Sequence, residues 1–382
     1  MMKKLYLLGA TGSIGLQTIE IIRSAPKDYV LAGLSGYNNF LTLKALVNEF
    51  EPEVVCVKGP VEAQEIMKEF PRVKVLFGEK GLVEIAGFNP SQDITIINAL
   101  VGMVGLKPTL KAIEANRTIL LANKETLVVG GHLIKEALSH SKAKIYPIDS
   151  EHSALWQLLN GEDIQTIKRL IITASGGAFR DKSRDELETV NLESALNHPN
   201  WSMGKKITID SATMINKGFE IIEAAYLFDI DIEKIDAVIH HESIIHSLVE
   251  FNDGSITAQL ADHDMRLPIA YALNYPLRKP SIAQELDIMR LNNLHFETLS
   301  KERYPMIAYA KEAYITGGSM RTVLNSANEI AVKLFLEKRI SFLEIERIVR
   351  KEMDNHQVIE FPSVTEIYQL DQEIKKRVEQ EY

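Results

Sequence analysis

The sequence predicts an α/β protein with an N-terminal Rossmann-like parallel sheet, a central α+β domain and a C-terminal helical bundle. Three observations support this prediction. Up to about residue 149, short β-rich runs alternate with amphipathic stretches, and a glycine-rich turn follows the first of these runs. After about residue 304, the apolar spacing is helical to the end of the chain. Alternating strands and helices indicate a parallel sheet with helices on both faces.

Seven strands are expected in the N-terminal part, and one intervening segment shows the helical pattern most clearly. In "FLTLKALVNEF", Phe40, Leu43, Leu46, Val47 and Phe50 recur at helical spacing. The expected strands are "KLYLLG", "YVLAGLSG", "EVVCVK", "VKVLFG", "DITIINAL", "TILLAN" and "KIYPID". In such a sheet, ligands bind beyond the carboxyl ends of the strands.

The central part has a different pattern, from residue 151 to about 285. The segments "IKRLIITAS", "IDAVIHHE", "IIHSLVEF" and "SITAQLAD" indicate strands, and "NDG" joins the last two as a hairpin turn. Helices are expected over "NKGFEIIEAAYLF" and "MRLPIAYALNYP". An antiparallel component is therefore expected in this part.

A stretch rich in proline, asparagine and charge then predicts a linker, followed by helices. Ser341 with Glu344, and Ser363 with Glu366, are capping-box signatures, and "TGG" at 316–318 is a helix stop. The predicted domains are 1–149, 150–285 and 304–382, with 286–303 as the linker.

Composition excludes several classes of function. The chain has 382 residues and a formal net charge of −9, with no block of like charge. This balance favours neither nucleic acid nor an anionic membrane surface as a partner. Cys56 is the single cysteine, which excludes an intrachain disulfide and fits a reducing compartment. No apolar stretch is long enough to span a bilayer, so a cytoplasmic protein is expected.

The turn "LLGATGSIG" places Gly9, Gly12 and Gly15 at G-x-x-G-x-x-G spacing. Glycines allow a tight turn and close approach to a pyrophosphate, and a helix N-terminus offers free amides. The alternative is a plain strand–turn–helix, but the position after the first strand favours a nucleotide. The second strand ends in "GLSGYNN", without the acid that NAD sites usually carry there. That absence favours NADP, although the stretch also lacks Arg and Lys.

Carboxylates from distant segments suggest a metal site. Asp149 and Glu151 follow the last predicted strand, and Glu220 lies at i+4 from Asn216. Two acids alone would better fit a loop or a helix cap. A third acid, without a Cys or His ligand set, suggests Mg²⁺ or Mn²⁺.

A second set of polar residues suits a phosphate monoester. It comprises Ser175, Ser211, Asn216 and Lys217, for which a capping serine and a surface Asn–Lys pair are the alternative. His198 and Trp201 lie in the loop "NHPNWSMGKK", which is either a lid or a loop anchored by its tryptophan. The histidines His240, His241 and His246 fit a structural role better than zinc binding.

Several motifs together resemble the 1-deoxy-D-xylulose 5-phosphate reductoisomerase family. They are "GATGSIG", "LANKETLV", "PIDSEHSA", "ITASGGAFR", "HPNWSMGKKITIDSATMINKGFEIIEA" and "LNSANEIAV". The resemblance covers nearly the whole chain and implies a homodimer. It also implies the isomerisation and NADPH-dependent reduction of 1-deoxy-D-xylulose 5-phosphate to 2-C-methyl-D-erythritol 4-phosphate, in non-mevalonate isoprenoid synthesis.

Site residues also follow from the resemblance. The metal ligands carried over are Asp149, Glu151 and Glu220. The cofactor contacts carried over are Thr11, Gly12, Ser13, Ile14, Gly36, Asn38, Asn123, Glu125 and Gly204. The substrate contacts carried over are Lys124, Ser150, Ser175, His198, Ser211, Asn216 and Lys217. Trp201 matches the flap residue that closes over the substrate, and Lys124 assists the chemistry.

The chain departs from the family pattern at three places. Tyr37 stands where many members carry a basic residue, which weakens a strict preference for NADP. Ala178 replaces the proline of "GGPF", and "HHES" replaces "HPQS". Two alternatives stay open on the residues alone. One is another Rossmann enzyme, such as a semialdehyde dehydrogenase, which needs a cysteine nucleophile. The other is a non-catalytic NADP(H)-binding regulator.

Overall fold

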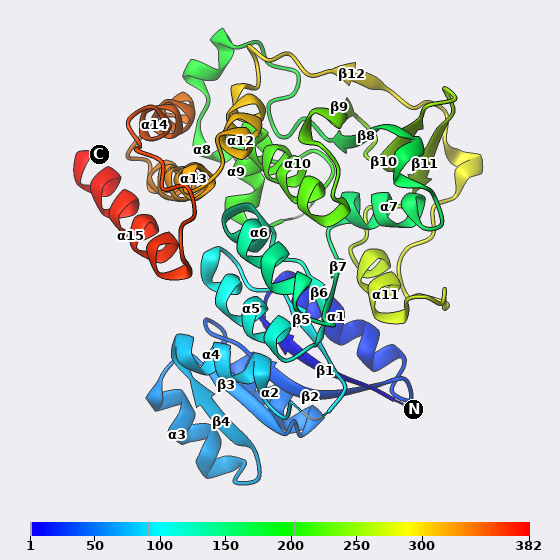
Figure 1. Cartoon of the computed structure of the whole chain (residues 1–382), viewed down its shortest axis with the longest axis vertical. Coiled ribbons are helices and arrows are strands. Elements are labelled where there is room, and N and C mark those ends of the chain that lie inside the picture. The colour runs from blue at the N-terminus through cyan, green and yellow to red at the C-terminus, as the bar shows by residue number, and fades with distance from the viewer. Residues whose placement is uncertain (1, 91, 202) are drawn as a thin grey trace. The chain divides into compact units, whose positions relative to one another are not determined.

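A computed structural model describes residues 2–90, 92–201 and 203–382 (Figure 1). The chain forms two compact units, which are interleaved in sequence. Unit 1 contains Met1–Leu127, Gly131–Ser153 and Asp264–Gln284, and unit 2 contains Val128–Gly130, Ala154–His263 and Glu285–Tyr382. Among the described residues, no helix is both long enough and apolar enough to cross a membrane.

Unit 1 is built on a seven-stranded sheet in the order β4-β3-β2-β1-β5-β6-β7. All of its strand pairs are parallel, which confirms the predicted Rossmann-like sheet. The strands are β1 (Lys3–Leu8), β2 (Tyr29–Ser35), β3 (Val54–Val57), β4 (Lys74–Phe77), β5 (Ile94–Asn98), β6 (Thr118–Leu121) and β7 (Lys144–Pro147). The helices are α1 (Ser13–Ser24), α2 (Phe40–Phe50), α3 (Pro60–Glu69), α4 (Gly78–Gly87), α5 (Leu106–Glu114), α6 (Lys124–Ser139) and α11 (Arg266–Asn274), with α7 (Ser150–Leu159) beginning in this unit.

The strand order reverses between β1 and β5. From β1 the chain proceeds outward to β4, then returns to β5 on the other side of β1. Such a reversal opens a crevice at the carboxyl ends of the two strands, where doubly wound sheets bind their ligands. The glycine turn follows β1 at this position.

The strands of this sheet form because their apolar runs are buried on both faces. All residues of β3 and β5 are buried, as expected of central parallel strands. Helix α2 follows the predicted periodicity, with Leu43, Leu46 and Val47 buried. Asn39 caps α2 by accepting a hydrogen bond from the amide of Thr42 at 3.2 Å.

Helix α11 belongs to unit 1 although it follows the central strands in sequence. It packs against α1, and Lys3 donates to the carbonyl of Leu273 at 2.6 Å. Tyr29 donates to Asn274 at 2.8 Å. These contacts connect α11 with β1 and β2, so residues 264–284 cluster with the N-terminal sheet.

Unit 2 contains a five-stranded sheet in the order β11-β10-β8-β9-β12. Its strands are β8 (Ile167–Ala174), β9 (Ile235–His240), β10 (Ile245–Phe251), β11 (Ile256–Leu260) and β12 (Phe296–Thr298). Only β8 and β9 pair in parallel, and β10 with β11 forms the predicted hairpin. Gly254 in its turn has φ +89°, which a glycine adopts without strain.

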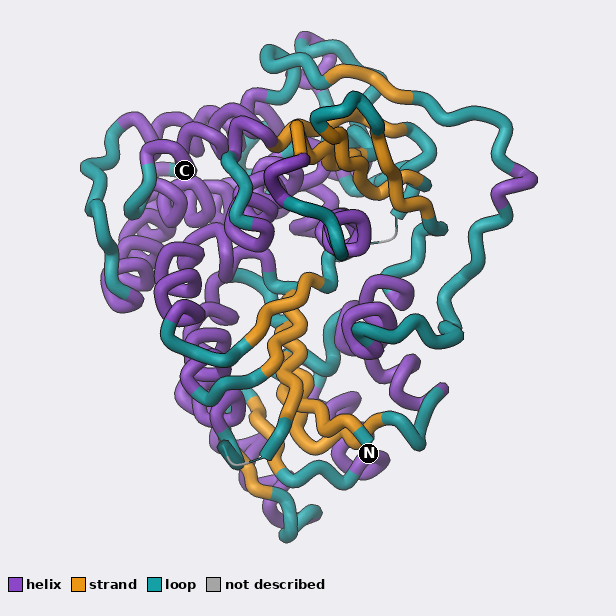
Figure 2. The backbone as a smooth tube through the Cα atoms, turned by 45° about the vertical axis from the view of Figure 1, so that its right-hand side comes forward, coloured by secondary structure: helices purple, strands orange, loops and turns teal. Residues whose placement is uncertain are grey.

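The remaining elements of unit 2 are mainly helices, and Figure 2 draws the helices of the chain in purple. They are α8 (Leu192–Ala195), α9 (Lys205–Thr213), α10 (Ile215–Phe228), α12 (Pro305–Thr316), α13 (Met320–Leu336), α14 (Phe342–Asp354) and α15 (Val364–Glu381). The two predicted capping boxes begin α14 and α15, and Gly317 ends α12 with φ +77°. Helix α13 is buried along most of its length and contacts both α14 and α15.

The expected linker contains one strand that we did not predict. β12 pairs antiparallel with β9, so part of the linker forms the edge of the second sheet. All three residues of β12 are exposed, and the strand depends on backbone pairing rather than on an apolar pattern. The division into 1–149, 150–285, 286–303 and 304–382 stays a prediction.

Candidate active site

The glycine turn leaves the first backbone amides of α1 free to bind an anion. Gly9 has φ +88°, and a Cβ atom there would lie 2.5 Å from the carbonyl oxygen of Ala99 after β5. A Cβ on Gly15 would lie 2.3 Å from the carbonyl oxygen of Gly9. Gly12 is the N-cap of α1, and no side chain caps this helix. The first amides of α1 are therefore available to a pyrophosphate.

The predicted cofactor residues Thr11, Gly12, Ser13 and Ile14 all lie in this turn or the first turn of α1. Gly36 directly follows β2 and lies beside this turn. A Cβ on Gly36 would lie 3.1 Å from Cγ2 of Thr11. Asn38 is exposed two residues further on. The ends of β1 and β2 thus place these predicted residues on one edge of the sheet.

At the end of β6, Asn123 organises the neighbouring loop. Its amide donates to the carbonyls of Leu100 and Gly102 at 3.0 and 2.9 Å and to Glu125 at 3.0 Å. Asn123, Lys124 and Glu125 are buried, and Lys124 is the first residue of α6. Asn123 and Glu125 therefore support the loop that follows β5, at the edge that carries the glycine turn.

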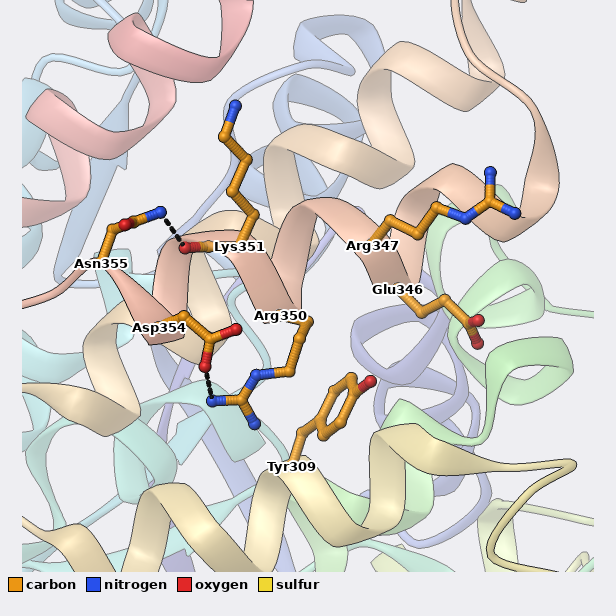
Figure 3. Close-up of a pocket in the computed structure, with 7 residues that line it drawn as sticks. All are labelled: Tyr309, Glu346, Arg347, Arg350, Lys351, Asp354 and Asn355. Carbon is orange, nitrogen blue, oxygen red and sulfur yellow. Dashed lines mark hydrogen bonds and ion pairs between the residues drawn. The ribbon is translucent and has the colours of Figure 1, made fainter.

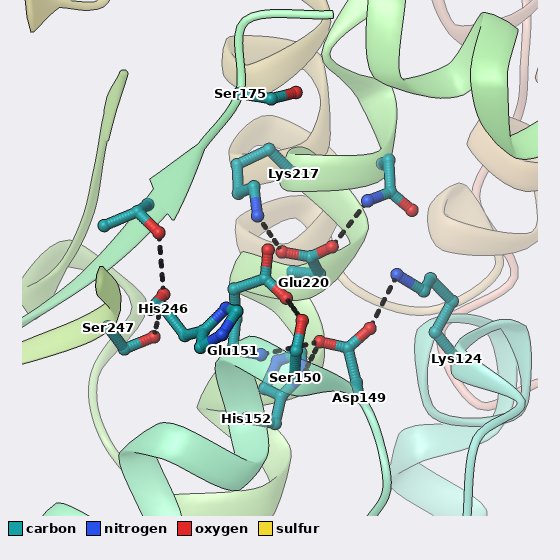
Figure 4. Close-up of polar contacts among 12 residues, drawn as sticks. Lys124, Asp149, Ser150, Glu151, His152, Ser175, Lys217, Glu220, His246 and Ser247 are labelled. Atoms are coloured by element: carbon teal, nitrogen blue, oxygen red, sulfur yellow. Dashed lines mark hydrogen bonds and ion pairs between the residues drawn. The ribbon is translucent and has the colours of Figure 1, made fainter. Parts of the chain in front are cut away.

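The predicted acid pair follows β7, on the same edge. The Lys124 ammonium lies 3.0 Å from one oxygen of Asp149, and Nδ1 of buried His152 lies 3.1 Å from the other (Figure 4). Asp149 also accepts from the amide of Glu151 at 3.3 Å, so it acts as a helix cap as well. The Ser150 hydroxyl donates to Glu151. A cation and hydrogen-bond donors thus hold the Asp149 carboxylate in place.

The third predicted acid, Glu220, lies on α10 in unit 2. It is only 1% exposed, and its carboxylate accepts from Asn216 at 2.5 Å and pairs with Lys217 (Figure 4). These three side chains share one side of the helix start, as their spacing predicts. Met214 precedes them in the left-handed conformation, with φ +64°, and separates α10 from α9. The left-handed Met214 therefore sets the direction in which α10 begins.

Two of the predicted phosphate donors, Ser175 and Ser211, lie where the loop after β8 packs on α9. Gly176 and Gly177 have φ +81° and +69°, and a Cβ on Gly177 would lie 2.6 Å from the carbonyl oxygen of Ser211. The amide of Gly177 donates to the Ser175 hydroxyl at 3.2 Å. Ser175 and Ser211 are therefore neighbours, although 36 positions separate them in the sequence.

His198 connects this loop with the segment that carries Trp201. Its Nδ1 accepts from the amides of Asn200 and Trp201 at 3.2 and 2.9 Å, so the proton of a neutral ring is on Nε2. Nε2 lies 2.9 Å from the Ser175 hydroxyl and donates to it. Burial lowers the pKa of His198 to about 4, and the nearby charges of Arg180 and His263 contribute. The imidazole is therefore neutral at pH 7.

Trp201 is half-buried between two histidines. Its ring lies edge-on to His263 with centroids 5.2 Å apart, and His246 lies at 6.4 Å. His246 is on β10 and His240 is on β9, where it stacks on Phe296 at 4.7 Å, so His240 has a structural position as predicted. Gly204, predicted as a cofactor contact, is the N-cap of α9.

Several residues at these sites were not predicted. His152 holds Asp149, and its signal is the i+3 spacing in "DSEH". Asn200 donates to Ser243 at 2.7 Å and to the carbonyl of His241 at 2.8 Å. Buried Asp210 accepts from Lys206 at 2.8 Å and Asn328 at 2.9 Å. The Lys206–Asp210 pair has the local i,i+4 spacing, but no local pattern predicts the distant partners of Asn200 or the contact of Asn328 with Asp210.

Two other features are not candidate sites for this chemistry. Cys56 is fully buried, and burial raises the pKa of its thiol to about 12, which excludes a thiolate nucleophile. A surface pocket lies on α12 and α14 (Figure 3) and contains none of the predicted site residues. Its Arg350 is paired with Glu312 and Asp354.

Comparison with known proteins decides the family. A profile described as 1-deoxy-D-xylulose 5-phosphate reductoisomerase matches residues 5–131, and profiles for C-terminal domains of that enzyme match 145–228 and 260–377. The 1-deoxy-D-xylulose 5-phosphate reductoisomerase of Bacillus cereus (strain Q1) is 52% identical over 97% of each chain. The chain belongs to the 1-deoxy-D-xylulose 5-phosphate reductoisomerase family.

Solved structures of this family have the same fold. A reductoisomerase in complex with NADPH, fosmidomycin and magnesium is 39% identical, with a TM-score of 0.92 over 98% of this chain and 97% of that one. The Zymomonas mobilis enzyme in complex with NADPH is 38% identical, with a TM-score of 0.91 over 99% and 98%. The family resemblance inferred from the motifs is thus confirmed.

Proposed function

We propose that the protein is the NADPH- and divalent-metal-dependent enzyme that converts 1-deoxy-D-xylulose 5-phosphate to 2-C-methyl-D-erythritol 4-phosphate. One observation carries the proposal: within the family fold, the glycine turn and the Lys124–Asp149 pair lie on the same edge of one parallel sheet. A dinucleotide held at the turn would lie beside the residues assigned to the chemistry. This reaction belongs to non-mevalonate isoprenoid synthesis.

The residues present fit a hard divalent cation. Asp149 and Glu151 in unit 1 and Glu220 in unit 2 are proposed as its ligands, because carboxylate oxygens suit Mg²⁺ and Mn²⁺. The ammonium groups of Lys124 and Lys217 neutralise two of these acids. A divalent cation held by these residues would polarise substrate oxygens, and a bound nicotinamide would supply the hydride for the reduction.

The turn after β1 fits the pyrophosphate of NADPH. The close approaches at Gly9 and Gly15 leave no room for side chains, and the uncapped amides of α1 face outward as donors. Thr11, Gly12, Ser13, Ile14, Gly36 and Asn38 are proposed to hold the cofactor from the ends of β1 and β2. Asn123 and Glu125 are proposed as contacts from the end of β6, and Gly204 as a contact from unit 2.

The remaining polar residues have distinct proposed roles. Ser175, Ser211, Asn216 and Lys217 hold the substrate phosphate, while Ser150 and Lys124 contact its reacting end. Lys124 stabilises developing negative charge on the substrate oxygen. His198 keeps Ser175 oriented through its Nε2 proton, and the segment with Trp201 closes over the substrate and excludes water.

The deciding experiment is an NADPH oxidation assay with 1-deoxy-D-xylulose 5-phosphate. Turnover should require Mg²⁺ or Mn²⁺, stop with EDTA and be inhibited by fosmidomycin, a ligand of a related structure. Absence of turnover with either metal would refute the proposal. NADPH binding without turnover would support the non-catalytic regulator, and turnover of an aldehyde substrate alone would support the semialdehyde dehydrogenase.

We further propose a cytoplasmic homodimer. The extended segment before and within β12 exposes Ile288 (62%), Met289 (89%) and Phe296 (44%), a set of apolar side chains that a second copy could bury. The single cysteine is free, which suits a reducing compartment. Light scattering coupled to gel filtration tests the dimer, and a mass of about 43.0 kDa would contradict it.

A further inference from the structure

The end of β2 poses a problem for recognition of NADPH. NADPH differs from NADH by a phosphate on the adenosine ribose, which doubly wound enzymes bind near the end of the second strand. In this chain, residues 36–39 at that end are Gly, Tyr, Asn and Asn. None of them carries a positive charge, and a phosphate dianion is bound most strongly by a cation.

The polar groups at this strand end are largely engaged or neutral. Asn39 already accepts from the amide of Thr42 as the cap of α2. The Tyr37 hydroxyl is a buried atom without a hydrogen-bond partner, and burial raises its pKa to about 12. Tyr37 therefore stays neutral, and the exposed side-chain amides of Asn38 and Asn39 are the remaining donors, both uncharged.

A cation, Lys58, directly follows the neighbouring strand β3. β2 and β3 pair in parallel with Ser35 opposite Cys56, and the amide of Gly36 donates to the carbonyl of Cys56 at 3.1 Å. Extending this register by two residues places Lys58 beside Tyr37. Both strands end at the edge of the sheet that carries the glycine turn.

Lys58 is available to a ligand. It is exposed and, among the residues that the structure describes, forms no ion pair or side-chain hydrogen bond. By contrast, Lys44 on α2 is paired with Glu65 and Glu69 on α3. Lys80 is also exposed, but it lies on α4 after β4, one strand further from β2.

We infer that Lys58 is the cation that recognises the 2′-phosphate of NADPH, taking over from the residue at the end of β2. This specificity role rests on the proposed NADPH-dependent function. Glu62 is the acid nearest in sequence, and its Oε2 would lie 3.2 Å from a Cβ on Gly59. Glu62 weakens the positive field of Lys58 and so limits the preference for NADPH over NADH.

Binding measurements without substrate test the inference. Dissociation constants of NADPH, NADH, 2′,5′-ADP and 5′-AMP are measured by titration calorimetry for the wild type and for Lys58→Gln. We expect Lys58→Gln to weaken the binding of NADPH and 2′,5′-ADP on the order of 10- to 100-fold. The affinities for NADH and 5′-AMP should stay unchanged. Glu62→Gln should strengthen the binding of NADPH but not that of NADH. Lys80→Gln is the matched control and should change neither affinity.

The outcomes separate this inference from the proposed function. Unchanged NADPH affinity in Lys58→Gln, or equal weakening of NADPH and NADH, would overturn the inference alone. A wild type that binds neither dinucleotide would overturn both. The inference also predicts that added salt weakens NADPH binding more in the wild type than in Lys58→Gln, because an exposed charge pair is screened.

Discussion

At the scale of single residues, buried charge is the main feature of the candidate site. Glu220 and Lys217 are 1% and 4% exposed and lie one helical turn apart. A buried ion pair is weak support for stability, because desolvation of both groups offsets their attraction. Its position in the first two turns of α10 therefore points to function, and removing one partner leaves the other charge uncompensated.

Glu220→Gln should separate catalysis from cofactor binding. The amide keeps the shape of the side chain but removes a negative charge from the proposed metal site. We expect turnover to fall on the order of 100-fold or more, while NADPH affinity stays nearly unchanged. Steady-state kinetics and NADPH fluorescence titration measure the two effects. Near-normal turnover with Mg²⁺ would refute the role of this acid, provided that circular dichroism shows an intact fold.

His198 makes the loop of Trp201 sensitive to pH. Its folded pKa, about 4, lies below the ordinary value of 6.5, so the neutral ring is favoured in the fold. Its stabilising contribution is therefore complete above pH 6.5 and is lost as the pH falls from 6.5 through 4. In a Trp156→Phe background, the emission of Trp201 in the folded protein should therefore change as the pH falls, with a midpoint near pH 4.

A matched variant identifies the titrating group in that experiment. His198→Asn keeps an acceptor for the amides of residues 200 and 201 but cannot take up a proton. Its Trp201 emission should stay flat over the same interval. An identical transition in both proteins would assign the titration to another group and contradict the prediction.

At the scale of elements, close helix packing positions the proposed ligand. A Cβ on Gly218 of α10 would lie 2.6 Å from the Cβ of Ala310 on α12 and 3.3 Å from the carbonyl oxygen of Met306. Gly218 therefore lets the two helices approach at the turn that carries Lys217 and Glu220. The position of these charges thus depends on the contact between α10 and α12.

Gly218→Ala should disturb the site by pushing the two helices apart. Overpacking of this kind costs about 1–3 kcal/mol, so we expect a lower melting temperature and reduced turnover. Ala310→Gly removes the opposing methyl group, and the double variant should recover both properties in part. Thermal denaturation and steady-state kinetics measure the effect, and a double variant no better than Gly218→Ala would show that this contact is not the cause.

Elements were predictable from the sequence to the extent that local chemistry determines them. The seven strands of the first sheet are short apolar runs, each with a polar residue or glycine at its end or within two residues of it, and the capping boxes of α14 and α15 are local signals. β12 lacked such a signal because its exposed residues depend on β9 as a partner. The position of α11 depends on its packing against α1, and the periodicity of a sequence does not predict which elements pack together.

At the scale of the whole molecule, the candidate site draws on segments that are distant in the sequence. Chemistry alone suggested the three acids and the phosphate donors, whereas most cofactor residues came from the family resemblance. The close approach of Gly36 to Thr11 leaves no pattern in the sequence other than the glycine itself. The proposed metal ligands are the clearest case, since Asp149 and Glu151 lie in unit 1 and Glu220 lies in unit 2.

Metal binding tests whether these acids act together. If Asp149, Glu151 and Glu220 share one cation, saturating Mn²⁺ raises the melting temperature of the wild type, because a ligand bound only by the folded state stabilises it. Asp149→Asn and Glu220→Gln should each remove most of this shift, and the double variant should lose little more, because the effects of residues that share one ligand are not additive.

Thermal denaturation with and without Mn²⁺ measures this shift, and Glu250→Gln, which changes an acid on β10, serves as the control. Additive losses in the double variant would indicate two independent cation sites and contradict the shared site.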